Sequence, residues 1–444
     1  MPDERPAWRD RCLAVGLDDA TAQAAATRFV RAAQALARLT GDAAPPLAYW
    51  VPGRVELLGK HTDYAGGRSL VCTLGRGFAV AAAPRRDARV RIIDSVSGVV
   101  AETAIDPDAS AAPAHWSNYP ITVARRIARN FPGARFGADL ALASDLPSAS
   151  GLSSSSALVV ATFLVLAAAN NLASHDVYRA SIGSCEALAA YLGAVESGRG
   201  YESLLGDHGV GTLGGAQDHT AILCTPAGAI AEYAYAPVRL ERVIPFPAGH
   251  TLVIAASGVT AHKAGRARTR YNEASLAVAE LLARWHAAGG TEPTLDAVVA
   301  VPGAVDALRA MLVGHPNATR LGERLTHFVA ERVEIVPAAS DALARGDYAR
   351  FGELVDRSQW GAEHLLRNQV PETVWLARRA RELDATAASA FGAGFGGSVW
   401  ALVPNGSAEA FVRRWRADYV ERFRRRAGRS AFFATMAGPA ATRL

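Results

Sequence analysis

The alternation of hydrophobic and polar residues divides the first half of the chain into helix-like and strand-like segments. Residues 8–40 carry apolar side chains at helical spacing among many alanines, and the proline pair Pro45-Pro46 ends that segment. Residues 47–58 alternate as a strand does. The pattern then predicts strands at 78–83, 90–94 and 138–143, a segment 100–105 that pairs with its neighbours as a hairpin, and helices at 115–130, 157–169 and 177–192.

The second half continues this mixture. An irregular, glycine-rich connection at 193–213 leads to strand-like segments at 229–234 and 250–256. We expect helices at 267–288, 305–313, 324–345, 349–368 and 407–427, a strand–glycine loop–strand at 388–403, and an alanine-rich tail. This interleaving predicts a mixed α+β fold of two α/β lobes with a cleft between them. A boundary at about 235–250 would give units of residues 1–240 and 241–444.

Composition is that of an ordinary globular enzyme. Of 444 residues, 50% are hydrophobic and 20% charged, with a net charge of +5. The arginine-rich segment 413–429 is interpreted as a solvated helix face, because no nucleic-acid-binding motif accompanies it. The longest apolar run, 157–169, is shorter than the roughly 20 residues that span a bilayer. We therefore expect neither a nucleic-acid nor a membrane partner.

Two further features indicate a cytoplasmic protein. The N-terminal residues, Met-Pro-Asp-Glu-Arg-Pro, lack the hydrophobic region of a signal peptide. The four cysteines lie far apart without metal-ligand spacing, which suits free thiols in a reducing compartment (Cys12, Cys72, Cys185 and Cys224).

The first segment with candidate chemistry is residues 146–157, Leu-Pro-Ser-Ala-Ser-Gly-Leu-Ser-Ser-Ser-Ser-Ala. It lies between a predicted strand and a predicted helix. Small residues let backbone N–H groups approach phosphate oxygens, and a helix N-terminus adds unpaired N–H groups and a positive dipole end. The alternative is a serine-rich helix N-terminus capped by its own hydroxyls. From this segment alone, both interpretations stand.

Three other segments are rich in potential ligands and lie far from it in sequence. Residues 53–67 form a dense polar turn after a strand, residues 389–398 form a glycine loop, and residues 214–220 place the lone acidic Asp218 among glycines. An isolated aspartate in such a setting is often part of a turn. Its significance therefore depends on the segments around it.

Together these segments resemble the galactokinase branch of the GHMP kinases, over about residues 45–405. Gly53–Gly67 is similar to the signature G-R-V-N-L-I-G-E-H-T-D-Y-N-G-G, residues 146–157 resemble the family's ATP phosphate loop, and 392–397 resemble its third motif. Residues 215–219 stand where the family has G-I-M-D-Q. Tyr271-Asn272 resembles a Y-N-x-R element, although Ala274 replaces its arginine.

The resemblance implies a fold and a reaction. The fold is a ribosomal protein S5-like N-terminal lobe with a left-handed crossover, an α/β C-terminal lobe, and an active site in the cleft between them. The reaction is transfer of a phosphoryl group from ATP, with Mg²⁺, to the anomeric hydroxyl of a sugar, by default D-galactose. The partners expected are the sugar and ATP, and the protein is expected to be a monomer or a homodimer.

The resemblance also implies roles for individual residues. Asp218 would be the catalytic base, with Arg54 beside it to stabilise charge. Mg²⁺ would be bound by Ser155 and Glu196, with Asp207 as a competitor for the acidic role. The sugar would contact Lys60, His61, Asp63, Gly215 and Tyr271. The nucleotide would contact Ser150, Gly151, Leu152, Ser153, Ser154, Ser155, Ser156, Gly394 and Gly396.

Three departures from the family pattern affect the choice of sugar. Lys60 stands where the signature has glutamate, Glu56 where it has asparagine, and His219 follows Asp218 in place of glutamine. A lysine could pair with the carboxylate of a uronic acid such as galacturonate. Alternatively, Lys60 turns to solvent or to an acidic neighbour and galactose is still bound. We expect Glu56 on the strand face by the nucleotide. A catalytically silent sugar and ATP sensor is a third hypothesis, although Asp218, Arg54 and the loop serines are all present.

Overall fold

The computed structural model describes residues 4–41, 47–110, 115–147, 149–260 and 265–444. The proline pair Pro45-Pro46 and Ser148 of the predicted phosphate loop lie outside the described residues.

The larger of two sheets has the strand order β12-β1-β2-β5-β3-β4, and β6 and β7 continue from the far end of β2. Neighbouring strands are antiparallel except for β3 and β5, which are parallel. The strands are β1 (Leu47–Leu58), β2 (Arg68–Pro84), β3 (Arg89–Asp94), β4 (Val100–Ala104), β5 (Ala138–Ser144), β6 (Ala229–Ala234), β7 (Arg239–Pro245) and β12 (Thr442–Arg443).

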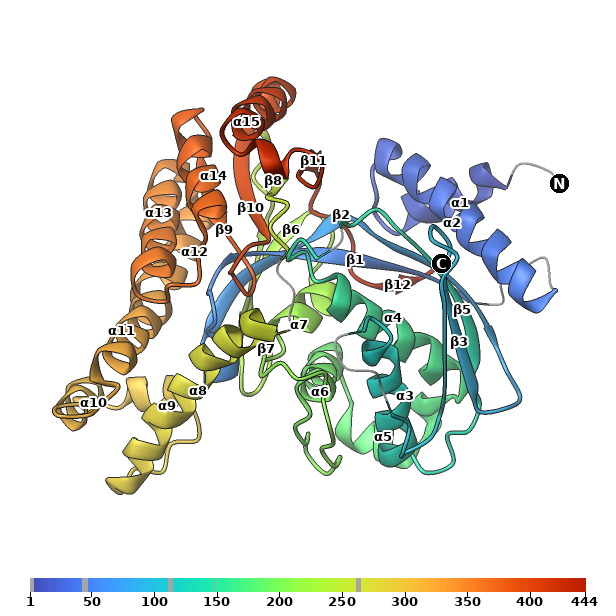
Figure 1. Cartoon of the computed structure of the whole chain (residues 1–444), viewed down its shortest axis with the longest axis horizontal. Helices are drawn as coiled ribbons and strands as arrows, with labels where there is room; N and C mark the ends of the chain where they lie inside the picture. Colours follow the sequence, from blue (N-terminus) through green and yellow to red (C-terminus); the bar gives the residue numbers. More distant parts are fainter. Residues whose placement is uncertain (1–3, 42–46, 111–114, 148, 261–264) are drawn as a thin grey trace.

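Helices cover both faces of this sheet (Figure 1). Ala48 and Trp50 of β1 pack against helices α1 (Arg5–Ala14) and α2 (Asp19–Thr40). Leu47, Tyr49 and Val51 point the other way, because successive strand residues face opposite sides. They join a core formed with α3 (Asn118–Asn130), α4 (Ser154–Ala169) and α6 (Cys185–Ser197). As a result, every residue of β1 is buried.

The smaller sheet has the order β11-β8-β10-β9. One face packs against α14 and α15, and the other shares a core with α12, α13 and the distal parts of β1 and β2. This shared core joins the two halves of the chain. The elements are β8 (His250–Ala256), β9 (Ala387–Ala390), β10 (Ser398–Pro404), β11 (Ala431–Thr435), α12 (Val336–Arg345), α13 (Tyr348–His364), α14 (Pro371–Glu382) and α15 (Ala408–Arg422).

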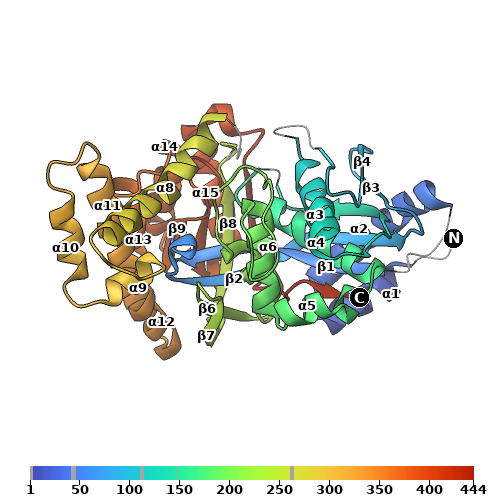
Figure 2. The same ribbon diagram turned by 90° about the horizontal axis from the view of Figure 1, so that it is seen from below.

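A group of helices extends the molecule away from the large sheet. Figure 2 shows α8 to α11 gathered at one end of the molecule and α1 to α4 toward the other. Helices α8 to α11 pack together with Ala65 of the short 3-10 helix η1 (Asp63–Ala65). They are α8 (Gly265–Ala287), α9 (Leu295–Ala300), α10 (Ala304–Met311) and α11 (Ala318–Val329), followed by a π-helical segment (Ala330–Ile335). Helix α7 (Gln217–Cys224) packs on β1 and β2, and α5 (Asp176–Ser181) packs on the short 3-10 helix η2 (Leu172–Ser174) that follows α4.

Most predicted elements are present, and the differences have local causes. The helix predicted over 8–40 is interrupted at Gly16, whose φ of 100° favours glycine. The helix predicted over 177–192 is two helices, and the one predicted over 324–345 begins at Ala318 and includes the π-helical segment. The pattern missed β7, α7, α9, α14, β11 and β12, and it predicted only the last part of β2. The division near residue 240 remains a prediction, and β7 crosses that position.

The expectation of four free thiols is wrong. Cys185 at the start of α6 and Cys224 at the end of α7 form a disulfide, with Cα atoms 5.9 Å apart. Packing of α6 against α7 brings together residues separated by 39 positions, which sequence spacing does not reveal. Cys12 and Cys72 are free and buried. In the part of the chain that the structure describes, no helix combines the length and the hydrophobicity needed to cross a membrane.

Candidate active site

A cavity of about 610 Å³ brings together side chains from segments far apart in the sequence. Its walls come from β1 and η1, the loop before α4, the facing ends of α6 and α7, Tyr271 of α8, and Gly392 and Ala393 of the loop between β9 and β10. All four segments that the sequence singled out therefore contribute to one site.

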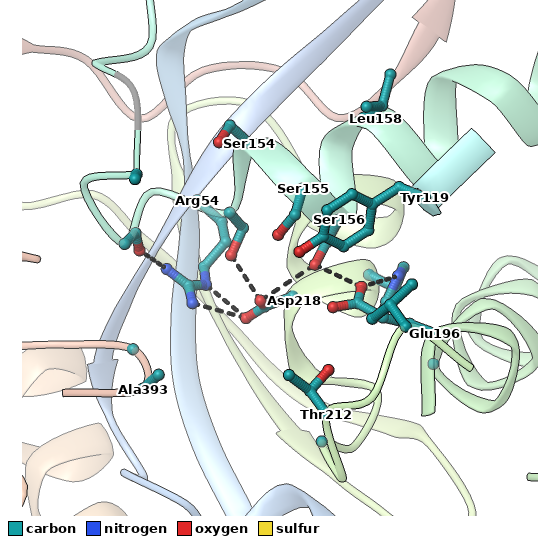
Figure 3. A pocket seen from close by; sticks show the side chains of 18 of the residues that line it. Arg54, Tyr119, Ser154, Ser155, Ser156, Leu158, Glu196, Thr212, Asp218 and Ala393 are labelled. Atoms are coloured by element: carbon teal, nitrogen blue, oxygen red, sulfur yellow. Dashed lines mark hydrogen bonds and ion pairs between the residues drawn. The ribbon is translucent and has the colours of Figure 1, made fainter. Parts of the chain in front are cut away.

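Arg54 and Asp218 form a partly buried ion pair in this cavity. Arg54 is 3% exposed, and its Nε and Nη2 lie 2.8 and 2.7 Å from Oδ1 of Asp218. Its Nη1 donates to the carbonyl oxygen of Gly151 at 2.7 Å. Figure 3 shows the guanidinium group facing the carboxylate. The cation compensates the charge of Asp218 and fixes its orientation.

The other oxygen of Asp218, Oδ2, accepts hydrogen bonds from serine hydroxyls of the phosphate loop. Ser153 Oγ donates to Oδ2 at 2.6 Å, and Ser156 Oγ lies 3.3 Å from it. Ser153 has a left-handed backbone, with φ 58° and ψ 36°, immediately before α4 begins. Left-handed non-glycine residues concentrate at functional sites, where the surrounding structure holds them. The acid is therefore tied directly to the N-terminus of α4.

The phosphate loop contributes to the cavity unevenly. Gly151 and all four serines from Ser153 to Ser156 line it. Ser150 and Leu152, also predicted to bind the nucleotide, do not: Ser150 accepts from Ser398 through its carbonyl oxygen, and Leu152 belongs to the shared core. The loop thus presents hydroxyls and the start of a helix to the cavity, as an anion site requires.

The glycine loop between β9 and β10 differs in detail from the prediction. Gly392 and Ala393 line the cavity, whereas Gly394 and Gly396 do not. A Cβ at Gly394 would lie 2.3 Å from the carbonyl oxygen of Asn368, and one at Gly396 would lie 2.6 Å from that of Val259. These two glycines are needed for the path of the loop.

Glu196 at the end of α6 is the acidic group beside the loop serines. It is 6% exposed, accepts from Ser156 Oγ at 2.9 Å, and lies 3.3 Å from His219 Nε2. Figure 3 shows the Ser156 hydroxyl between Asp218 and Glu196. The competing acid, Asp207, is paired with Arg125 and Arg129 and does not line the cavity.

These residues fit a magnesium ion held partly by a substrate. Mg²⁺ usually binds one or two carboxylates together with phosphate oxygens and water. Glu196 and the hydroxyl of Ser155 supply oxygen atoms at the cavity. Among the described residues no cluster of three or more His, Cys, Asp or Glu side chains could hold a metal ion, so phosphates would have to complete the coordination.

His61, Asp63, Gly215 and Tyr271 line the opposite part of the cavity. The His61 ring lies 3.0 Å from Tyr64 Oη through Nδ1 and 3.2 Å from the Ala393 carbonyl oxygen through Nε2. Burial, reinforced by Arg324, lowers the pKa of His61 to about 3, so the ring is neutral at physiological pH.

The backbone fits closely around Asp63 in this part of the cavity. Asp63 Oδ2 accepts from the Gln217 backbone N–H at 3.2 Å. A Cβ at Gly215 would lie 2.4 Å from the same oxygen, so only glycine fits there. Burial raises the pKa of Asp63. Its carboxyl group is therefore held rigidly at the cavity wall.

Lys60 turns away from the cavity. It is fully buried, and its Nζ donates to Ser358 Oγ at 2.9 Å. Ser358 in turn donates to Glu331 Oε1 at 2.5 Å, and Glu331 Oε2 accepts the Gly59 backbone N–H at 3.2 Å. Burial lowers the pKa of Lys60, and Glu331 and Glu56 oppose that effect. Of the two interpretations of Lys60, the structure matches the one in which it turns to an acidic neighbour.

The sequence interpretation missed several residues of the site. Glu56, which the sequence analysis expected by the nucleotide, lines the cavity, and the charged groups that act on it are Lys60, Arg54, Asp218 and Asp63. Its place by the nucleotide stays a prediction. The cavity is also lined by Thr212, by His115 and Trp116 before α3, and by Asn118 and Tyr119 at the start of α3. No local pattern marks these residues as ligands.

Comparison with known proteins finds family matches that contain three of the four segments of the site. Residues 36–84 match the galactokinase galactose-binding signature, residues 118–199 the GHMP kinase N-terminal domain, and residues 339–421 the GHMP kinase C-terminal domain. The chain is 32% identical to the galactokinase of Chloroflexus aggregans over 84% of this chain and 87% of the relative. It is 29% identical to that of Lactiplantibacillus plantarum, over 83% and 89%.

Solved structures share the fold. The galactokinase of Lactococcus lactis, complexed with galactose, superposes with a TM-score of 0.75 at 24% identity, covering 93% of this chain and 98% of that one. The mevalonate kinase of L. major in complex with R-mevalonate gives a TM-score of 0.51 at 15% identity, covering 89% and 97%. The architecture is therefore the GHMP kinase fold, with N- and C-terminal domains.

Proposed function

Because this chain belongs to the galactokinase family of the GHMP kinases, we propose that it phosphorylates D-galactose at the anomeric hydroxyl, using ATP. The proposal rests chiefly on the Arg54–Asp218 pair, which lies where the phosphate loop meets the polar pocket formed by His61, Asp63 and Tyr271. Relatives that match most of the chain carry the name galactokinase. Like other ATP-dependent metabolic kinases, the enzyme would act in the cytoplasm.

In the proposed reaction the anomeric oxygen attacks the γ-phosphorus and the bond to the leaving ADP oxygen breaks. Asp218 accepts the hydroxyl proton or aligns the hydroxyl, which requires a carboxylate in a fixed position. The contacts from Arg54 and Ser153 provide that position. The Arg54 guanidinium, which pairs with Asp218, would also stabilise negative charge on the phosphoryl group during its transfer.

The nucleotide phosphates would occupy the space at the start of α4. Backbone N–H groups of the first helical turn and the hydroxyls of Ser154 and Ser155 are the donors available to them, because Ser153 and Ser156 already donate to Asp218 and Glu196. Ser155 and Glu196 would hold Mg²⁺ there. The ion, when bound, would neutralise charge on the phosphates.

Galactose is favoured over galacturonate by the charge of the cavity. Glu56, Asp63 and Asp218 bring three carboxyl groups to this part of the wall, and the guanidinium of Arg54 there is already paired with Asp218. Lys60, the residue that suggested an acidic sugar, donates to Ser358 outside the cavity lining. A sugar carboxylate would therefore meet like charge, whereas neutral hydroxyls can donate to these groups.

The experiment that tests the function is product analysis by ³¹P NMR after incubation with ATP, Mg²⁺ and galactose. We expect ADP and a sugar 1-phosphate in equal amounts. A panel of galacturonate, glucuronate, arabinose, N-acetylgalactosamine and homoserine should give less product. Absence of product from every acceptor, with ATP still bound, would contradict the enzyme proposal and favour the catalytically silent sensor.

A further inference from the structure

Glu56 is an ionisable residue of the cavity to which the proposed reaction assigns no contact with a substrate. It lies on β1 two residues after Arg54, so both side chains project from the same face of the strand. It lines the cavity and is 2% exposed. The galactokinase signature has an uncharged asparagine at this position. A buried carboxyl group here therefore departs from that signature.

Within the described residues, Oε1 of Glu56 is buried without a hydrogen-bond partner. A buried polar atom left unpaired costs about 1–3 kcal/mol, and more when it is charged. The two nearby cations attract the carboxyl group electrostatically, but their N–H groups bond elsewhere: Lys60 to Ser358, and Arg54 to Asp218 and Gly151. The protein contacts thus leave an acceptor unfilled on a side chain that lines the cavity.

We propose that Glu56 is a ligand of the acceptor sugar, its unpaired carboxylate oxygen accepting a hydrogen bond from a sugar hydroxyl. This inference rests on the proposed function and extends it by one specificity-determining residue. A hydroxyl donates to a carboxylate, whereas a sugar carboxylate in the same place would be repelled. Glu56 therefore contributes to the selection of a neutral sugar over an acidic one.

The alternative ligand for Glu56 is the nucleotide, and the surrounding charges argue against it. The charged groups that influence Glu56 are Lys60 and Arg54, which favour its ionised form, and Asp218 and Asp63, which oppose it. A carboxylate in this position would repel phosphate oxygens, so it belongs beside the uncharged substrate.

The role of Glu56 makes sugar binding depend on pH. Burial raises the pKa of Glu56 to about 7, even though Lys60 and Arg54 lower it. The ionised carboxylate is a stronger hydrogen-bond acceptor than the protonated acid, so affinity for galactose should rise as pH increases through about 7. His61, with a pKa near 3, does not titrate in this range.

The test compares Glu56→Gln with a matched control, Glu232→Gln. Glu232 is also a buried glutamate of the large sheet, with 6% exposure, but it accepts from Ser340 outside the cavity lining. Galactose affinity is measured by calorimetry without ATP. Replacing the charged acceptor should raise the Kd of E56Q about tenfold or more, leaving the KM for ATP within about twofold. E232Q should match the wild type in both.

A Kd for galactose within about twofold of the wild type in folded E56Q would overturn the inference. A second measurement needs no variant: the wild-type Kd for galactose, followed from pH 5.5 to 8.5 (about 1.5 units either side of the inflection). A flat profile would also overturn it. If the wild type phosphorylates galactose and E56Q binds galactose with an unchanged Kd, only the role of Glu56 is rejected. Failure of the wild type to bind or phosphorylate galactose rejects the proposed function itself, and this inference with it.

Discussion

Two charge clusters form around cations that lie close together in the sequence, Arg54 and Lys60, and the clusters differ in what surrounds them. The catalytic cluster consists of Arg54, Asp218, Ser153, Ser156 and Glu196, and all of its members line the cavity. The Lys60 cluster consists of Lys60, Ser358 and Glu331, none of which lines it. Arg54 and Lys60 are only six residues apart, yet one cation faces the substrate space and the other faces the C-terminal helices.

The difference shows that a charge in a functional motif need not act on the substrate. In the Lys60 cluster, the chain of hydrogen bonds from Lys60 through Ser358 ends on Glu331, which also receives the backbone of Gly59. This cluster ties the turn after β1 to α13 and the π-helical segment. The catalytic cluster instead leaves Asp218, Glu196 and the loop hydroxyls beside open space.

The largest expected effect separates catalysis from stability within the catalytic cluster. Asp218→Asn should lower kcat about 10³- to 10⁴-fold, because the amide cannot accept the hydroxyl proton. The Kd for galactose and the urea midpoint should change little. Asp87→Asn, at a 54% exposed side chain outside the cavity lining, is the control and should keep wild-type kcat. A D218N enzyme with wild-type kcat would remove Asp218 as the base.

The opposite pattern is expected when the Lys60 cluster is broken. Lys60→Met leaves the buried Glu331 without its cation, which should lower the free energy of unfolding by about 3 kcal/mol. The preference for galactose over galacturonate should persist. The double variant K60M/E331Q should recover part of the stability in urea denaturation. A stable K60M protein whose preference shifts between the two sugars would show that Lys60 does reach the substrate.

Glu56, which lines the same cavity as the catalytic cluster, should make the free energy of unfolding depend on pH. Its pKa is raised from an ordinary 4.5 to about 7 in the folded protein. Between these values the folded state holds a proton that the unfolded state has lost, so the contribution of Glu56 to stability falls as pH rises. Glu56→Gln should therefore gain about 1–3 kcal/mol relative to the wild type between pH 4.5 and pH 8. Urea titrations at both pH values measure this, and a difference independent of pH would contradict it.

The smallest expected effect concerns the metal. Ser155→Ala should raise the Mg²⁺ concentration for half-maximal activity about three- to tenfold, because one oxygen ligand is lost while Glu196 and the phosphates remain. Mg²⁺ titration of the initial rate at saturating ATP and galactose is the measurement. A larger change in Ser154→Ala or Ser156→Ala would move the role to that serine.

The sequence predicts this architecture and site well where the signal is local. The strand at 47–58, the hairpin of β3 with β4, and the strand–loop–strand of β9 and β10 follow from hydrophobic periodicity. The resemblance of separate motifs to one family implied that Arg54, Asp218 and Glu196 belong to one site. The structure brings all three to one cavity.

The features that sequence did not reveal depend on contacts between distant residues. The direction of Lys60 is set by Ser358, 298 positions away, and the disulfide by the packing of α6 on α7. Strand β12 is only two residues long and is defined by pairing with β1. Gly394 and Gly396 shape their loop against Asn368 and Val259, so a glycine motif alone could not tell which members face the cavity.

The most direct test of the account is the ratio of kcat/KM for galactose to that for galacturonate, measured by coupled ADP release on the wild-type protein. With Lys60 paired outside the cavity and the carboxyl groups of Glu56, Asp63 and Asp218 in its wall, the ratio should be about 100 or more, since unfavourable charge contacts cost several kcal/mol. A ratio below one would mean that the cavity accepts a carboxylate, and the assignment of galactose as the substrate would be wrong.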